Sequence, residues 1–188
     1  MKTYVSKTTS CCFNVLHKIR SIRRLVYKSI LLSLAPSLVC THLDYGSTNL
    51  AGISSRLLDR LQSVLNAAVQ LLCDGRKYDH ISPLLRYSHC LQVLQRIKFH
   101  LAVLIYYCRN HTASEYLSRD LQKAANSDSC RWLRSSSTHK LIVPWTRLKT
   151  VGGRTFGVAA AWFWNDLPST VVRLITATFH EMLKNIFV

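Results

Sequence analysis

The sequence predicts a mainly α-helical protein: a helical bundle, then a smaller helical unit with one or two short β-strands. Three observations lead to this fold class. Apolar residues recur at three- and four-residue spacing through much of the first 123 residues, which is the period of an amphipathic helix. A serine-rich polar stretch then interrupts this pattern, and β-branched residues follow it. Because 48% of the 188 residues are hydrophobic, the chain can bury a core.

The two longest helices are predicted at residues 13–34 and 54–73. The first carries an apolar stripe of Val15, Leu16, Ile19, Ile22, Val26, Ile30 and Leu34. Pro36 is expected to interrupt or kink it. The second carries a wide apolar face of Leu57, Leu58, Leu61, Val64, Leu65, Ala68, Val69 and Leu72. Gly75 is well placed to end this second helix in a left-handed turn.

The remaining elements are shorter. Within the predicted bundle, residues 1–123, three further helices are expected at residues 84–87, 94–108 and 116–121. The polar stretch 124–139 is the predicted linker to a small C-terminal unit, residues 140–188. In that unit we expect one or two short strands within 140–151 and helices at 154–164 and 178–187. The aromatic run 162–164 cannot form one flat stacking platform, because consecutive helical residues point in different directions, so core packing is predicted instead, with Trp145 and Phe156 nearby in the sequence.

The charge of the chain predicts a polyanionic partner. The formal net charge is +16, and no acidic residue precedes Asp44. The candidate contacts to an RNA or DNA backbone are Lys18, Arg20, Arg23, Arg24 and Lys28, which we call the basic cluster. Tyr27 is a candidate for stacking on an exposed base. A nuclear localisation signal and a solvated helix face remain alternative interpretations of the same residues.

A membrane partner is not expected, although membrane association stays an alternative. Residues 30–40 are apolar and follow basic residues, but spanning a bilayer takes about 20 apolar residues. Bulky Val39 stands before Cys40, where a signal-peptide cleavage site requires a small residue. We therefore predict a buried helix in an intracellular protein, nuclear or cytoplasmic.

No catalytic residue, metal site or cofactor is predicted. The nine acidic residues include no adjacent pair and no Asp-x-Asp, so the sequence does not indicate a two-metal polymerase or nuclease site. The seven cysteines include no CxxC pair, which favours reduced, buried thiols over a zinc site. His89-Cys90 is one candidate for a Cys/His nucleophile, but no spacing selects a partner for it. We expect no enzymatic activity and no small-molecule substrate.

Many short blocks resemble, in order, the C-terminal part of the reverse transcriptases of LINE-type (non-LTR) retrotransposons. Residues 58–68 (LDRLQSVLNAA) are similar to the family's LDRLQxVQNAA, and residues 76–83 (RKYDHISP) to its RKFDHITP. Residues 164–168 (WNDLP) resemble its WNxLP. Weaker blocks fall at 10–13, 23–24, 43–45, 96–99, 114–121, 133–136, 143–147, 153–156 and 179–187. The resemblance spans nearly the whole chain.

The sequence departs from the family pattern at several positions. Gly46 and Ser47 replace the last two residues of its DYCN, and residues 89–93 (HCLQV) lack the Trp and Pro of its HWLPV. The proline expected before Tyr116 is also absent. Such changes are typical of a decaying element copy.

The resemblance implies the thumb and the region after the palm of the polymerase. The family's endonuclease and metal-binding palm would lie upstream, so no catalytic residue is carried over. A thumb holds a template–primer duplex by its backbone, which agrees with the basic cluster. The expected function is therefore that of a reverse transcriptase fragment with, at most, nonspecific RNA or DNA binding. A domesticated or non-functional open reading frame remains an alternative.

Overall fold

The computed structural model describes residues 1–73, 79–110, 112–122, 140–148 and 152–168, and these are mainly helical, as predicted. The chain divides into two compact units. Unit 1 consists of the described residues within 1–47 and 53–96, and unit 2 of residues 48–52 with the described residues from 97 onward. The predicted linker 124–139 and the predicted closing helix 178–187 lie outside the described residues, so the predicted domain boundaries stay a prediction.

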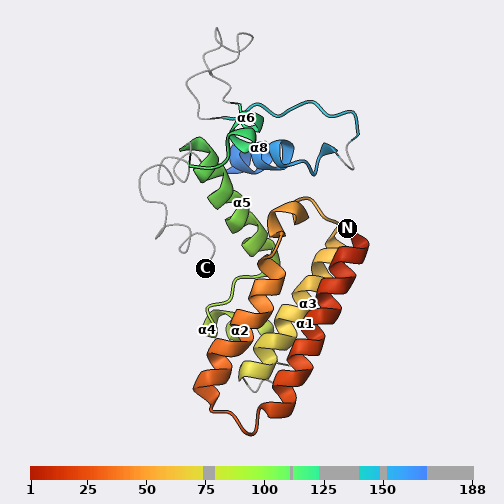
Figure 1. The fold of residues 1–188 in the computed structure, drawn as a ribbon, viewed down its shortest axis with the longest axis vertical. Helices are drawn as coiled ribbons and strands as arrows, with labels where there is room; N and C mark the ends of the chain where they lie inside the picture. The colour runs from red at the N-terminus through yellow and green to blue at the C-terminus, as the bar shows by residue number, and fades with distance from the viewer. Residues whose placement is uncertain (74–78, 111, 123–139, 149–151, 169–188) are drawn as a thin grey trace. The chain divides into compact units, whose positions relative to one another are not determined.

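Unit 1 is built on three long helices: α1 (Lys2–Ile22), α2 (Lys28–Asp44) and α3 (Ser55–Cys73). Helices α1 and α3 run in the same direction, and α2 runs in the opposite direction (Figure 1). Each of the three packs against the other two. This arrangement confirms the predicted helical bundle.

The predicted single helix at 13–34 is wrong, because the chain turns back at residues 23–27. In one straight helix, Leu31 would lie about 18 Å beyond Ile19. The turn instead places both side chains in one buried cluster with Leu72 of α3. Tertiary burial of this apolar stripe therefore overrides its continuous helical period.

The predicted interruption at Pro36 does not occur, since α2 continues through this residue to Asp44. An interior proline removes one helical hydrogen bond and costs about 3 kcal/mol. The residues beyond Pro36 offset this cost because Val39 and Leu43 are buried. The Ser37 hydroxyl also donates to the Ser33 carbonyl at 2.6 Å, which provides a local hydrogen bond at the interrupted turn.

Helix α3 confirms the clearest sequence prediction. Its first residue is Ser55 and its last is Cys73, within one residue of the predicted bounds. The inward face holds the buried residues Leu61, Val64, Leu65, Ala68, Val69 and Leu72. Burying such a leucine side chain is worth about 1.5–3 kcal/mol, so this face is a main source of the stability of unit 1.

Two shorter elements complete unit 1. Helix α4 (Ile81–Tyr87) packs against α3. Helix α5 (Val93–Arg109) begins in this unit, where the Val93 N–H donates to the Gln62 side-chain oxygen at 2.9 Å. Because the first N–H groups of a helix have no partner within it, Gln62 of α3 fixes the start of α5.

A half-buried ion pair joins α2 to the first turn of α5. Arg96 Nε donates to Asp44 Oδ1 at 2.8 Å, and its Nη2 donates to Asp44 Oδ2. The two side chains are only 17% and 26% exposed. A bidentate ion pair that is so little exposed to solvent is stronger than an ion pair on the surface. Removing one partner leaves the other charge in a poorly solvated place.

We expect Asp44→Ala to lower the free energy of unfolding by about 2 kcal/mol, because Arg96 loses both charged hydrogen bonds. The control is Glu115→Ala, which breaks the i,i+4 pair with Arg119, where the side chains are 79% and 75% exposed. Removing this surface pair should cost less than about 0.5 kcal/mol. Urea denaturation followed by circular dichroism measures both changes. Equal losses would show that the Arg96–Asp44 pair contributes no more than a surface pair.

Unit 2 contains the rest of α5, α6 (Glu115–Asp120) and α8 (Phe156–Asp166), and the 3-10 helix at Ser47–Leu50 extends into it. Trp164 is 2% exposed, and the Arg109 guanidinium lies 4.5 Å from its ring centroid. Trp162 and Trp145 are 67% and 86% exposed. The predicted aromatic core is therefore confirmed for Trp164 and wrong for these two residues.

The predicted strands do not form in the described residues 140–148, where Leu141 makes only an isolated bridge. The Asn165 side chain makes the backbone hydrogen bonds that a neighbouring strand would otherwise make. Its amide accepts from the Leu141 N–H and donates to the Leu141 carbonyl, both at 2.9 Å. The Ile142 N–H donates to the Gln122 carbonyl at the same distance. These bonds satisfy the backbone without a sheet.

Candidate nucleic-acid interface

The turn between α1 and α2 brings the basic cluster together at one end of the unit 1 bundle (Figure 1). Lys18 and Arg20 lie in the last turns of α1, and Lys28 is the first residue of α2. Arg23 and Arg24 lie in the turn itself. The sequence predicted these five side chains along one helix, whereas the structure gathers them around a hairpin turn.

Packing of the apolar neighbours directs the cations outward. Ile19 is buried against α3, and Val26, which lies within the turn, packs on the same cluster. Four of the five cations are exposed, and Arg23 is half-buried. The long stems of such side chains lie along apolar surface while the charge stays in water. The basic cluster is thus accessible to a large anion.

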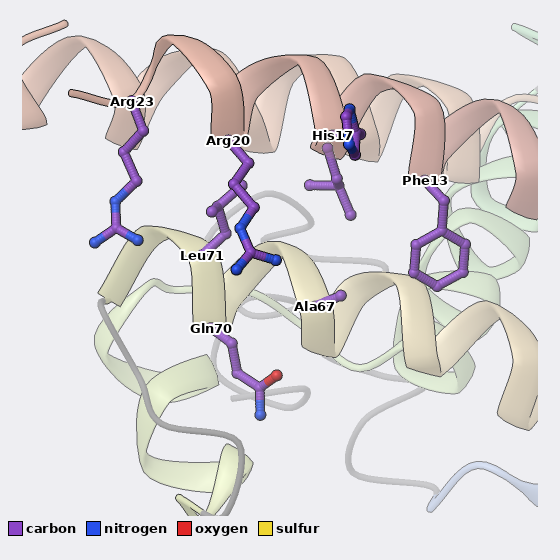
Figure 2. Close-up of a pocket in the computed structure, with 8 residues that line it drawn as sticks. Phe13, His17, Arg20, Arg23, Ala67, Gln70 and Leu71 are labelled. Carbon is purple, nitrogen blue, oxygen red and sulfur yellow. The ribbon is translucent and has the colours of Figure 1, made fainter. Parts of the chain in front are cut away.

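The cluster continues into a groove between α1 and α3 (Figure 2). Figure 2 shows the Arg20 and Arg23 side chains reaching from α1 toward α3. The groove is lined by Phe13, Leu16, His17, Arg20, Arg23, Ala67, Gln70 and Leu71. A second hollow at the turn is lined by Arg20, Ser21, Arg23 and Arg24. Arg20 and Arg23 line both hollows, so part of the basic cluster lies on concave surface.

Backbone dipoles at the turn add to the side-chain charges. Tyr27, the N-cap residue of α2, makes no side-chain cap hydrogen bond, and the first turn of α2 has no acidic residue. The start of a helix carries a partial positive charge and N–H groups that can donate to an anion. Lys28 stands at this same end, so dipole and side chain attract a phosphate together.

Exposed aromatic and apolar side chains flank the cations. Tyr27 is 81% exposed and remains the candidate for base stacking. Leu25, at 86% exposed, was not singled out from the sequence, and neither were His17 and Gln70 in the groove. No helical pattern in the sequence marks these positions. They become part of the site only through the turn at 23–27 and the packing of α1 on α3.

The described residues contain no group of three or more His, Cys, Asp or Glu side chains placed to bind a metal ion. In the same part of the chain, no helix combines the length and apolar character that crossing a membrane requires. Comparison with protein-family models, with curated proteins and with solved structures finds no significant match.

Proposed function

We propose that this chain is the thumb and post-palm region of a non-LTR retrotransposon reverse transcriptase and that it binds RNA or DNA through the backbone. In this proposal the chain has no polymerase or endonuclease activity, takes no cofactor or small-molecule substrate, and acts inside the cell. The ordered blocks of sequence resemblance support the origin. The charged turn of unit 1 supports the binding.

The observation that carries the binding proposal is the gathering of the basic cluster at one exposed turn. The 43 residues before Asp44 contain no acidic side chain that would oppose it. Lysine and arginine placed against phosphates release condensed counterions, which favours binding most strongly at low salt. This contribution does not depend on base sequence.

Salt dependence measured on the full chain tests this proposal. Fluorescence anisotropy follows binding to two labelled DNA duplexes of unrelated sequence over a series of salt concentrations. If all five cations contact phosphates, the plot of log K against log salt should have a slope of about −4.5, since each contact contributes about −0.9. We expect the same slope and similar affinity for both duplexes. Binding that ignores salt, or that strongly prefers one sequence, would contradict backbone recognition.

A further inference from the structure

Two cysteines that are 50 positions apart in the sequence meet beside the Arg96–Asp44 ion pair. Cys40 lies in α2 one helical turn before Asp44, and Cys90 follows α4. Their side chains are joined by a hydrogen bond, and both thiols are free and half-buried. All four residues belong to unit 1. Spacing in the sequence could not select a partner for Cys90, whereas the structure places Cys40 in contact with it.

The backbone around Cys90 holds this thiol in place. The Cys90 N–H donates to the Leu85 carbonyl at 2.9 Å. His89, just before it, has a φ of 49°, a left-handed conformation that residues other than glycine rarely adopt. Asp44 holds Arg96 by two hydrogen bonds, and the Arg96 charge acts on both thiols. The site therefore combines a fixed thiol, a second thiol in contact with it and a fixed cation.

We propose that Cys90 is an oxidation-sensitive thiol, with Cys40 as its resolving partner, and that hydrogen peroxide converts the pair to a reversible disulfide. This combination of features is typical of reactive cysteines: a thiol near a cation, partly accessible, with another thiol within reach. The proposal is independent of nucleic-acid binding.

The electrostatics of the site decide which sulfur reacts first. The hydrogen bond from Cys40 and the charge of Arg96 lower the pKa of Cys90 to about 7, against the opposing effect of burial. The same hydrogen bond and burial raise the pKa of Cys40. Cys90 is therefore the more readily deprotonated thiol of the two, which makes it the nucleophile, while Cys40 holds its proton more strongly.

The reaction has two balanced steps. The Cys90 thiolate attacks one peroxide oxygen, so that an S–O bond forms, the O–O bond breaks, and the leaving hydroxide takes a proton to become water. Cys90 is then a sulfenic acid. Cys40 loses its proton and attacks the Cys90 sulfur, so that the S–S bond forms at about 2 Å, the S–O bond breaks, and a second water leaves. The two sulfurs together lose two electrons, which reduce the peroxide.

Peptide mapping of the full chain tests the pair. The reduced protein is treated with limiting hydrogen peroxide, its remaining thiols are blocked with N-ethylmaleimide, and the digest is analysed by mass spectrometry. We expect the main product to be a peptide linking Cys40 to Cys90, which dithiothreitol separates. In Cys40→Ser, Cys90 should instead be trapped by dimedone as a sulfenic acid. A main product that links other cysteines, or oxidation of Cys90 to sulfinic acid without any link, would overturn the proposal.

Alkylation by iodoacetamide at a series of pH values tests the reactivity without any variant. Cys73 is the internal control, because it is also half-buried and its sulfur lies 3.4 Å from the Ser88 hydroxyl oxygen. At pH 7 Cys90 should react about fivefold faster than Cys73, since a pKa lowered to about 7 leaves a large share of Cys90 as the reactive thiolate. Its rate should reach half of the maximum near pH 7. Equal rates for the two thiols, with a midpoint above pH 8, would contradict the proposal.

Discussion

Leu65→Ala should destabilise unit 1 by about 2–5 kcal/mol, which is the range for truncating a buried leucine. Leu65 is 1% exposed on the inward face of α3, the helix that packs against α1, α2 and α4. Truncation removes apolar contacts and leaves a cavity on the inward face of α3. Small domains have a free energy of unfolding of only about 5–15 kcal/mol, so this loss is a large share of the stability of unit 1. The variant should therefore unfold at mild denaturant concentrations.

Urea denaturation followed by circular dichroism measures this loss. The matched control is Leu38→Ala, which removes the same atoms from a side chain on α2 that is 40% exposed. The control should cost less than about 1 kcal/mol, because its site is partly solvated before and after the change. If both variants unfolded at the same urea concentration, α3 would not be the centre of the core.

Reversing two exposed arginines of the basic cluster should weaken nucleic-acid binding on the order of fiftyfold at about 0.1 M salt. Arg20→Glu with Arg24→Glu removes two phosphate contacts, each worth about eightfold at this salt concentration according to the counterion-release relation. Arg23 is left unchanged because it is half-buried, and its replacement would disturb the packing of the turn. Anisotropy with a labelled duplex measures the change.

The control reverses Arg56 and Arg60, two exposed arginines on the first turns of α3. Both double variants lower the formal net charge from +16 to +12, since each reversal removes two units. Arg56 lies about 24 Å along α3 from Leu72, which packs near the α1–α2 turn. At 0.1 M salt, charges more than about 10 Å apart are largely screened, so the control should bind almost as well as the unchanged chain.

The sequence predicted α3 closely because its signal is local and strong. Leucine, valine and alanine recur at helical spacing from 57 to 72, and every residue of the predicted face from Leu61 onward is buried. The turn at 23–27 was missed for the opposite reason. It contains no glycine or proline, and Val26 continues the apolar period across it. Only the packing of Ile19 and Leu31 against Leu72 reveals the break.

The candidate site was predictable in part. A run of cations in a stretch without acidic residues identifies the basic cluster from charge alone. Its arrangement around a hairpin, and its groove against Ala67 and Gln70, depend on contacts between helices that the sequence does not specify. The contact between Cys40 and Cys90 could not be predicted from the sequence for the same reason.

The most direct test of backbone binding at the α1–α2 turn is the salt slope of the two reversed variants. For Arg20→Glu/Arg24→Glu, the plot of log K against log salt should be shallower than that of the unchanged chain by about 1.8, the contribution of two phosphate contacts. For Arg56→Glu/Arg60→Glu, the slope should stay the same. Equal flattening in both variants, or none in the first, would show that the basic cluster is not the surface that holds the nucleic acid.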